Sequence, residues 1–191
     1  GGQARGWPAP GARGRGGGRR VHAGRVVTAE IDEVRFPKGQ VGELEIIRHS
    51  GASAVLPFLG DQTSEDPQIL LIRQYRYAAD GFIYEIPAGR LEPGEPPESC
   101  AVRELREETG CTAEKMVHLY TMYTTPGFTD EKIHLFVATG LVRGDSALEP
   151  DEFVEVVPMQ MSAALKMIKE GTINDAKTAL SILYVAGFFL G

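Results

Sequence analysis

The chain has few of the residues and patterns that mark secreted, membrane-embedded or repeat proteins. Its 191 residues include two cysteines, Cys100 and Cys111, whose spacing matches no metal-binding pattern. No secretory signal is visible and no internal repeat can be found. We therefore expect one enzyme-sized domain in a reduced, cytoplasmic compartment, where 42% apolar residues are enough to bury one sizeable core.

Long hydrophobic runs are also missing. The most apolar stretch, residues 179–190, is far shorter than the roughly 20 residues that a membrane-spanning helix needs. We interpret it as a buried helix or as part of a subunit interface, and we expect no membrane partner.

Acidic residues are absent from the first 20 positions, although the whole chain has a net charge of −6. The remainder is therefore more acidic than the total suggests, which argues against a nucleic-acid-binding domain. The arginine- and glycine-rich start could bind RNA as a disordered arm. Glycine-rich polar sequence does not offset its ordering entropy, however, so we interpret residues 1–23 as a disordered leader. The arginines of residues 1–20 are Arg5, Arg13, Arg15, Arg19 and Arg20.

A cluster of carboxylates is what the chain does have. Glu104 and Glu108 are four residues apart and Glu107 is three from Glu104, so a helix places all three on neighbouring parts of one face. Like charges at this spacing repel, and a solvated helix surface is the ordinary explanation. A bound cation is the alternative, because Mg²⁺ takes oxygen ligands from carboxylates and substrate phosphates.

The flanking residues predict where this helix begins and ends. Pro96 and Pro97 suit a first helical turn, and Gly110 suits the left-handed position after the last turn. An apolar run at residues 82–86 precedes it, followed by a turn at residues 93–94. This segment is therefore predicted to form a strand, a loop and a helix, with the carboxylates on the helix.

This segment resembles the Nudix box. Gly89, Glu95, Arg103, Glu104, Leu105, Glu107, Glu108 and Gly110 have the spacing of that signature. Its last position, usually a bulky aliphatic residue, is Cys111, which can serve as a small buried hydrophobe. The resemblance implies an α+β fold, an α/β/α sandwich around a mixed β-sheet. It also implies hydrolysis of a nucleoside diphosphate linked to another moiety, with Mg²⁺, or with Mn²⁺ or another divalent cation in its place.

Other segments resemble the ADP-ribose pyrophosphatase subfamily, from about Gly24 to the C-terminus. Pro126 follows Gly110 by sixteen positions and opens the run Pro-Gly-Phe-Thr-Asp-Glu. Residues 73–76, 84–89 and 174–178 are similar too. The resemblance implies hydrolysis of ADP-ribose to AMP and ribose 5-phosphate. Two alternatives stay open: another nucleotide sugar or dinucleotide as substrate, and a non-catalytic nucleotide-sugar-binding regulator. Intact box glutamates and the lack of a helix-turn-helix segment speak against the regulator.

The resemblance also assigns site residues. Glu104 and Glu108 are the first candidates for metal ligands and Glu107 the next, and the family pattern adds the backbone carbonyl of Ala88. Arg103 is expected to orient the carboxylates, with an ordinary surface ion pair as the alternative, and Glu95 is expected to anchor the loop.

The general base of this subfamily often comes from a later acidic loop. Glu152 is the first candidate, as base or additional metal ligand, followed by Glu149 and Glu131. A solvated acidic turn explains any one of them equally well.

Substrate-binding candidates lie elsewhere in the chain. Arg73 and Arg76 could hold phosphate or the terminal ribose through forked donors, or could simply pair with Glu85 or another acid. Phe36 could stack on adenine, or could be an ordinary packed side chain. The remaining candidates of this kind are Glu85, Pro126 and Phe128.

The pattern of turns and apolar residues, taken with the resemblance, predicts the domain organisation. A Nudix domain at residues 24–191 would contain an N-terminal sheet at 24–50 and a catalytic core at 51–191. The resemblance implies that the N-terminal antiparallel sheet exchanges with a second subunit, giving a homodimer. Strands are expected at residues 25–34, 41–48, 52–59, 68–75, 115–123, 132–141 and 153–159, and further helices at 162–169 and 175–189, the last with Asp175 as N-cap.

Overall fold

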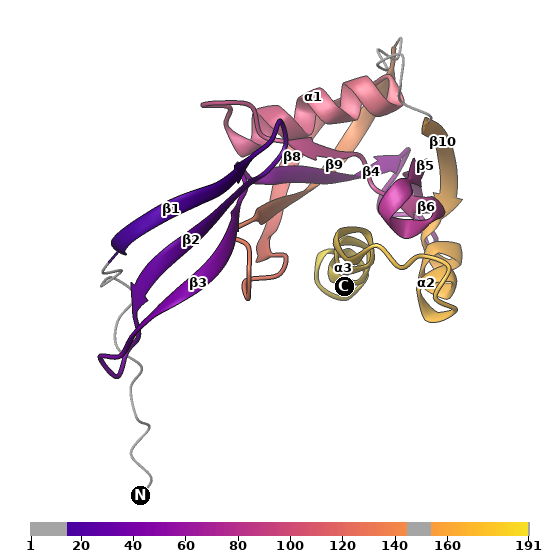
Figure 1. Cartoon of the computed structure of the whole chain (residues 1–191). Helices are drawn as coiled ribbons and strands as arrows, with labels where there is room; N and C mark the ends of the chain where they lie inside the picture. Colours follow the sequence, from indigo (N-terminus) through magenta and orange to yellow (C-terminus); the bar gives the residue numbers. More distant parts are fainter. Residues whose placement is uncertain (1–14, 145–153, 191) are drawn as a thin grey trace, which may run out of the picture. The chain divides into compact units, whose positions relative to one another are not determined.

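The structure, a computed structural model, describes residues 15–144 and 154–190 (Figure 1). The described chain divides into two compact units. The first contains the chain up to His49 together with Thr124–Glu131, and the second contains Ser50–Tyr123 and the chain from Lys132 onward.

The first unit is an antiparallel three-stranded sheet in the order β1-β2-β3. Its strands are β1 (Arg15–Ala23), β2 (Thr28–Arg35) and β3 (Val41–Arg48). β2 and β3 pair without interruption from Thr28↔Arg48 to Arg35↔Val41. This sheet confirms the extra N-terminal antiparallel sheet that the sequence predicts.

Strand β1 differs from expectation. The sequence predicts a disordered leader through residue 23, but residues 15–23 form a strand that pairs with β2 from Arg15↔Val34 to Ala23↔Thr28. Pairing of this kind uses backbone N–H and C=O groups, so it does not require the apolar side chains on which strand prediction depends. Residues 1–14 lie outside the described part of the chain.

Arg48 joins the parts of the first unit. Its Nε donates to Glu30 at 3.0 Å, one Nη donates to Asp130 at 3.2 Å, and the other Nη pairs with Asp32. Burial lowers the pKa of Arg48, but these hydrogen bonds outweigh it and raise the pKa above its ordinary value. The network holds the segment Thr124–Glu131 against β3.

The second unit contains a mixed sheet in the order β10-β5-β4-β9-β8, with β6 beside β5 and β7 beside β4. β4 and β9 are parallel and the other pairs are antiparallel. The strands are β4 (Ala52–Leu59), β5 (Gln68–Arg76), β6 (Gly81–Glu85), β7 (Ala88–Arg90), β8 (Cys111–Tyr123), β9 (Lys132–Arg143) and β10 (Val154–Gln160). The helical segments are η1 (Tyr77–Ala79), α1 (Pro97–Thr109), α2 (Met161–Lys169), α3 (Ala176–Tyr184) and the π-helical η2 (Val185–Phe189).

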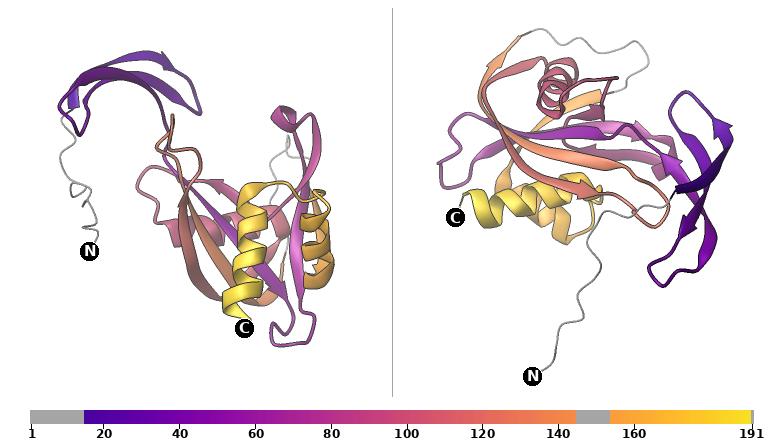
Figure 2. Two further views of the ribbon diagram at one scale, coloured as in Figure 1. Left: turned by 90° about the horizontal axis from the view of Figure 1, so that it is seen from below. Right: turned by 90° about the vertical axis from the view of Figure 1, so that its left-hand side faces the viewer.

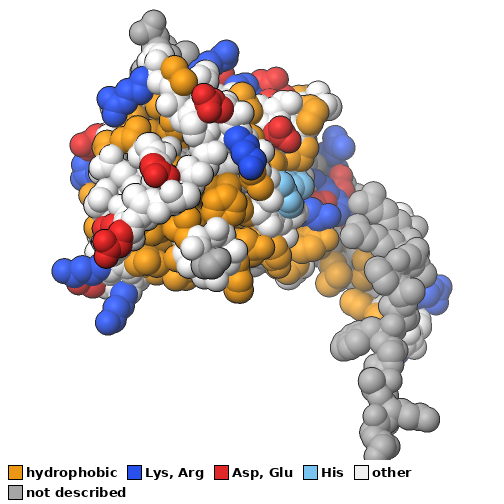
Figure 3. Space-filling view, turned by 180° about the vertical axis from the view of Figure 1, so that it is seen from behind, with side chains coloured by type: hydrophobic (Ala, Val, Ile, Leu, Met, Phe, Trp, Pro, Cys, Tyr) orange, Lys and Arg blue, Asp and Glu red, His pale blue; other side chains and the backbone are white. Residues whose placement is uncertain are grey.

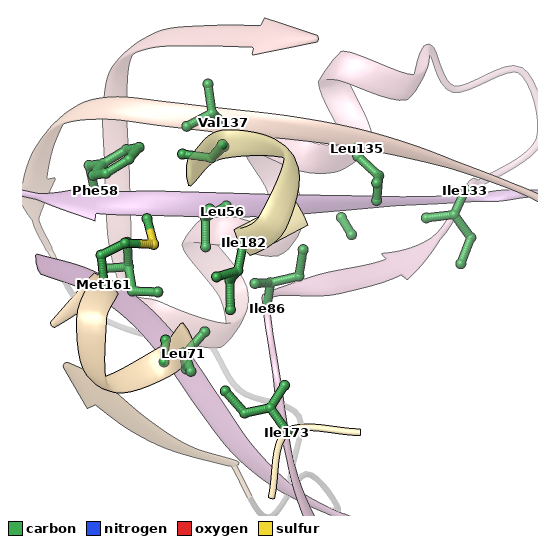
Figure 4. Close-up of a cluster of buried hydrophobic side chains, with 14 residues drawn as sticks. Leu56, Phe58, Leu71, Ile86, Ile133, Leu135, Val137, Met161, Ile173 and Ile182 are labelled. Atoms are coloured by element: carbon green, nitrogen blue, oxygen red, sulfur yellow. The ribbon is translucent and has the colours of Figure 1, made fainter. Parts of the chain in front are cut away.

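Helices cover both faces of this sheet, α1 on one and α2 with α3 on the other (Figures 1 and 2). Alternation along β4 explains the two cores, since successive side chains point to opposite faces. Val55 packs in a cluster with Leu105 of α1, whereas Leu56 joins Ile182 of α3 in the larger cluster drawn in Figure 4. The α+β sandwich that the sequence predicts is confirmed.

The predicted helix ends are also confirmed. Pro97 is the first residue of α1, and Gly110 adopts φ 69° at its C-cap. Asp175 caps α3, with its side chain accepting from the Thr178 amide at 3.0 Å. The expected strands at 41–48 and 52–59 coincide with β3 and β4.

The C-terminal apolar stretch is partly buried and partly exposed. Ile182 and Val185 are in the core, whereas Leu183 and Phe188 are exposed. On the face shown in Figure 3, hydrophobic side chains of the larger unit lie between charged ones. Within the described residues, none of the helices is long and apolar enough to span a membrane.

Candidate active site

Helix α1 brings the three box carboxylates together. Glu104 is 9% exposed and Glu108 is 3% exposed, while Glu107 lies closer to the surface. The one-turn spacing of Glu104 and Glu108 puts both on the buried side of the helix. Buried carboxylates need partners, and each of these has them.

Arg103 is the first partner. One of its Nη atoms donates to Glu104 at 2.6 Å and to Glu107 at 3.1 Å. Its Nε and other Nη form a bidentate pair with Glu95 at 2.9 and 3.0 Å. These hydrogen bonds, led by those with Glu95, raise the pKa of Arg103 above its ordinary value. A single guanidinium therefore orients two of the box carboxylates and ties them to Glu95.

Glu95 fastens the loop between β7 and α1. Besides its pair with Arg103, it accepts a hydrogen bond from the Glu92 amide at 3.0 Å. The Arg103 hydrogen bonds are the main cause that lowers the pKa of Glu95 to about 2. This agrees with the anchoring role expected from the sequence, and it leaves Glu95 charged throughout the neutral range.

The backbone of β7 lies directly beside these carboxylates. The Ala88 amide donates to Glu108 Oε2 at 2.9 Å. At Gly89 an added Cβ would lie 1.8 Å from Glu104 Oε1, much closer than any real contact. Gly89 is therefore required for close approach, because the Glu104 carboxylate occupies the space a side chain would fill.

Cys100 of α1 lies next to the Gly89 backbone and the Arg103 side chain. Its Sγ is 3.5 Å from the Gly89 carbonyl oxygen and 3.4 Å from an Arg103 Nη. Burial raises the pKa of this thiol to about 11, so the thiol stays protonated at neutral pH. Its role is therefore that of a packed, unreactive side chain.

The donor chemistry of this cluster suits a hard divalent cation. Glu104, Glu107, Glu108 and the Ala88 carbonyl offer only oxygen, the ligand that Mg²⁺ prefers. The Gly89 cradle keeps the Glu104 carboxylate next to the Ala88–Gly89 backbone. Within the described residues, however, no group of three or more His, Cys, Asp or Glu side chains has the geometry of a metal site. The residues fit the ion by chemistry and proximity, with Arg103 supplying the positive charge beside them.

The two candidate arginines of β5 have different surroundings. Strand alternation places Arg73 and Arg76 on opposite faces. Arg73 lies 4.6 Å from the centre of the Phe82 ring and 3.5 Å from Glu155. Arg76 donates from Nε to Glu85 at 2.7 Å.

Arg76 is also the arginine associated with the carboxylate helix. Burial lowers its pKa, but the hydrogen bond and charge of Glu85, with the charges of Glu108 and Asp175, raise it above the ordinary value. Glu85 is 3% exposed and also accepts from Lys177 at 2.5 Å. Arg76 and Glu85 therefore belong to the surroundings of the box, while the Arg73 contacts lie on the other face of β5.

The remaining candidates belong to the first unit or lie outside the described residues. Phe36 packs its ring against Gly42, and Phe128 is about half exposed. Pro126 lies in the same segment, Thr124–Glu131. Glu131 accepts from the Thr124 hydroxyl at 2.9 Å and lies 3.3 Å from His49 Nδ1. Glu149 and Glu152 fall within residues 145–153, which the structure does not describe.

Sequence reasoning did not assign roles to three further residues of the second unit. Thr178 and Lys177 contact the segment that precedes β7, and the only advance signal was the similarity of residues 174–178 to the subfamily. Gln74 lies between the two arginines of β5. Its side-chain Oε1 is buried and has no hydrogen-bond partner within the described part of the chain.

Comparison with known proteins defines the class. Residues 48–179 match the family described as NUDIX domain. The fold is similar to a solved structure of an ADP compounds hydrolase, with a TM-score of 0.75 at 22% identity over 91% of each chain. The chain therefore belongs to the Nudix hydrolase family.

Two curated relatives cover most of the chain. It is 44% identical over 167 residues to the methanol dehydrogenase activator of Bacillus methanolicus. It is 40% identical over 167 residues to the ADP-ribose pyrophosphatase of Bacillus subtilis (strain 168). Each alignment covers 86% of this chain and 88% of the relative. The resemblance to Nudix hydrolases and to the ADP-ribose pyrophosphatase subfamily is confirmed.

Proposed function

We propose that this Nudix hydrolase cleaves the diphosphate of ADP-ribose, giving AMP and ribose 5-phosphate. The observation that carries diphosphate hydrolysis is the carboxylate face of α1 held beside the Ala88–Gly89 backbone. The choice of ADP-ribose is supported by the 40% identical ADP-ribose pyrophosphatase. Two free, buried cysteines suit action in the cytoplasm.

A divalent cation, Mg²⁺ or Mn²⁺, is the proposed cofactor, with Glu104, Glu107, Glu108 and the Ala88 carbonyl as ligands. When bound, such an ion neutralises the diphosphate and lowers the pKa of water. Arg103 keeps two of the carboxylates in place, and the Ala88 amide keeps Glu108 in place. This preorganisation is the contribution of the chain, since groups held in position need no rearrangement during the reaction.

Proton abstraction from the attacking water needs a further group. We assign this role to Glu152, as base or additional metal ligand, with Glu149 and then Glu131 as alternatives. Glu131 already has Thr124 and His49 as partners, which favours the other two.

Substrate contacts are proposed for both units. In the second unit, Glu85 accepts a hydrogen bond from Nε of Arg76 and so holds the guanidinium in place. The two Nη groups of Arg76 are then suited to donate to a phosphate or a ribose. Arg73 is a weaker candidate because it is engaged by Phe82 and Glu155. In the first unit, Phe36 and Phe128 are proposed to contact adenine, together with Pro126.

A homodimer formed through the β1-β2-β3 sheet is also proposed. This sheet forms a unit of its own and has no helix among its described residues. Its exposed apolar side chains include Val21, Val26, Val41 and Leu44. Side chains of this kind are what a subunit interface buries.

The test is turnover on a panel of ADP-ribose, ADP-glucose, NADH, diadenosine polyphosphates and nucleoside triphosphates with Mg²⁺, followed by chromatographic separation of the products. A dominant rate with ADP-ribose, abolished by a chelator, supports the proposal. Preference for another diphosphate derivative would keep the chemistry and replace the substrate. Tight binding of ADP-ribose without turnover of any compound would identify a regulator.

A second candidate function is activation of a dehydrogenase, favoured by the 44% identical methanol dehydrogenase activator. The rate of a purified methanol dehydrogenase would be measured with and without this protein. An increase that the Glu108→Gln variant also produces would indicate an effect of binding alone. An increase that requires wild-type Glu108 would connect activation to hydrolysis.

A further inference from the structure

Thr178, the third residue of α3, forms a hydrogen-bond relay inside the second unit. Its hydroxyl donates to Asp175 Oδ2 at 2.5 Å and accepts from the Ile86 amide at 2.9 Å. A hydroxyl has one proton, so donation to Asp175 directs its lone pairs toward the backbone of Ile86. Thr178 and Ile86 are both 0% exposed, so neither group can exchange its partner for water.

Lys177 makes a second connection to the same segment. Its Nζ lies 2.5 Å from Glu85 Oε1 and 3.0 Å from Asp175 Oδ1. The other oxygen of Glu85 binds Arg76. Lys177 thus supplies one of two cations around a buried carboxylate, a group that is costly to bury without such partners.

The segment that these residues hold leads directly to the box. Two residues after Ile86, the Ala88 amide donates to Glu108, and the Pro87 carbonyl between them accepts from the Val55 amide at 2.9 Å. Residues 85–88 are therefore fixed by α3 at one end and by α1 at the other. Movement at Ile86 would change the position of the Ala88 backbone.

Packing alone does not require these polar groups. Ile86 and Ile182 point into the same apolar cluster (Figure 4), where a valine at position 178 would have nearly the shape of threonine. Removal of the hydroxyl would leave the buried Ile86 amide without this partner, so Thr178→Val is expected to destabilise the fold as well as to change the site. What the hydroxyl and ammonium specifically provide is the direction of the Ile86 amide and of the Glu85 carboxylate.

We propose that Thr178 and Lys177, with Asp175 behind them, are positioning residues for the diphosphate site. Thr178 sets the backbone that carries the Ala88 carbonyl and supports Glu108, and Lys177 sets Glu85 and thereby Arg76. This inference rests on the proposed function, because the site they position is the proposed metal and diphosphate site. Thr178 is therefore expected to affect binding of the cation, and Lys177 is expected to affect binding of the substrate.

The first test compares Thr178→Val with Thr178→Ser. Mn²⁺ affinity is measured directly by the electron paramagnetic resonance signal of free Mn²⁺, without substrate. Loss of an outer partner of a metal site typically lowers affinity by about 10-fold or more, and we expect this of Thr178→Val. Thr178→Ser retains the hydroxyl and should stay within about twofold of wild type on the same reasoning. Ile182→Val on the same helix is the matched control for destabilisation, and its Mn²⁺ affinity should not change.

The second test compares Lys177→Met with Lys177→Arg under saturating Mg²⁺. Lys177→Met should raise KM several-fold, by roughly the amount expected for one weakened charged contact, with Mn²⁺ affinity close to wild type. Lys177→Arg should restore most of the loss because it keeps a cation beside Glu85.

Three results would overturn the inference. These are wild-type Mn²⁺ affinity in Thr178→Val, an equal loss of affinity in Ile182→Val, and a wild-type protein that does not bind Mn²⁺. Failure of the proposed function would give a different set of results. No diphosphate compound would be hydrolysed, but Thr178→Val would still weaken Mn²⁺ binding. Direct metal binding therefore separates the two ideas.

Discussion

Glu108 is the most consequential single residue because it is buried and accepts a hydrogen bond from the backbone of β7. Changing Glu108 to Gln removes charge at the proposed cation without opening a cavity, so kcat should fall by orders of magnitude while the fold persists. Steady-state kinetics and circular dichroism measure the two effects. Glu98→Gln, an exposed change on the same helix, is the control. Near-normal turnover of Glu108→Gln would refute the metal assignment.

Glu95 leads to a prediction about pH. Its pKa of about 2 lies below the ordinary value of 4.5, so its stabilising effect is complete above about pH 4.5 and is lost as pH falls toward 2. The free energy of unfolding should therefore be higher for wild type than for Glu95→Gln at neutral pH. The difference should shrink between about pH 4.5 and pH 2. Urea unfolding at several pH values measures it, and a constant difference would contradict the role of the Arg103 pair.

At the scale of elements, the connection from β7 to α1 depends on Gly89. Gly89→Ala would force the Glu104 carboxylate away from its place, since the new Cβ would lie 1.8 Å from Glu104 Oε1. We expect loss of most activity with a folded protein, measured by turnover and thermal unfolding. Gly187→Ala, where an added Cβ meets nothing within 4 Å, should behave as wild type. Equal activity of both variants would show that Glu104 can be displaced without consequence.

The sequence predicts the elements whose signals are local. Helix α1 is marked at both ends by proline and glycine, and its carboxylate face follows from helical spacing alone. Asp175 is recognisable as a cap for the same reason. These features depend on neighbours along the chain, which is why they can be read without a structure.

What the sequence does not provide depends on pairing between distant residues. Strand β1 exists through its backbone pairing with β2, which a glycine- and arginine-rich composition does not reveal. The choice of Glu85 as partner for Arg76 and of Glu155 for Arg73 needs the register of β5 with β6 and β10. Thr178 and Ile86 are 92 residues apart, and neither segment contains a local signal that predicts their hydrogen bond.

At the scale of the whole molecule, the first 23 residues separate into two parts that deletion can distinguish. Removing residues 1–14 should leave turnover and oligomeric state unchanged. Removing residues 1–23 also deletes β1, which exposes the edge of β2. The shorter protein should form a less stable dimer or larger aggregates, measured by light scattering after gel filtration. A monomeric wild-type protein would refute the proposed homodimer, and unchanged behaviour of the shorter protein would show that β1 is dispensable.

The connection from α3 to the segment before the box has a consequence for synthesis on the ribosome. Every box residue has been added to the chain by Cys111, but the groups of α3 that hold Ile86 and Glu85 arrive only with residues 175–178. A growing chain therefore carries its complete carboxylate helix long before the backbone beside it is fixed. Hydrolysis of nucleotides would begin only when the last helix has left the exit tunnel, so fragments that end before α3 should be inactive even when their sheets have formed.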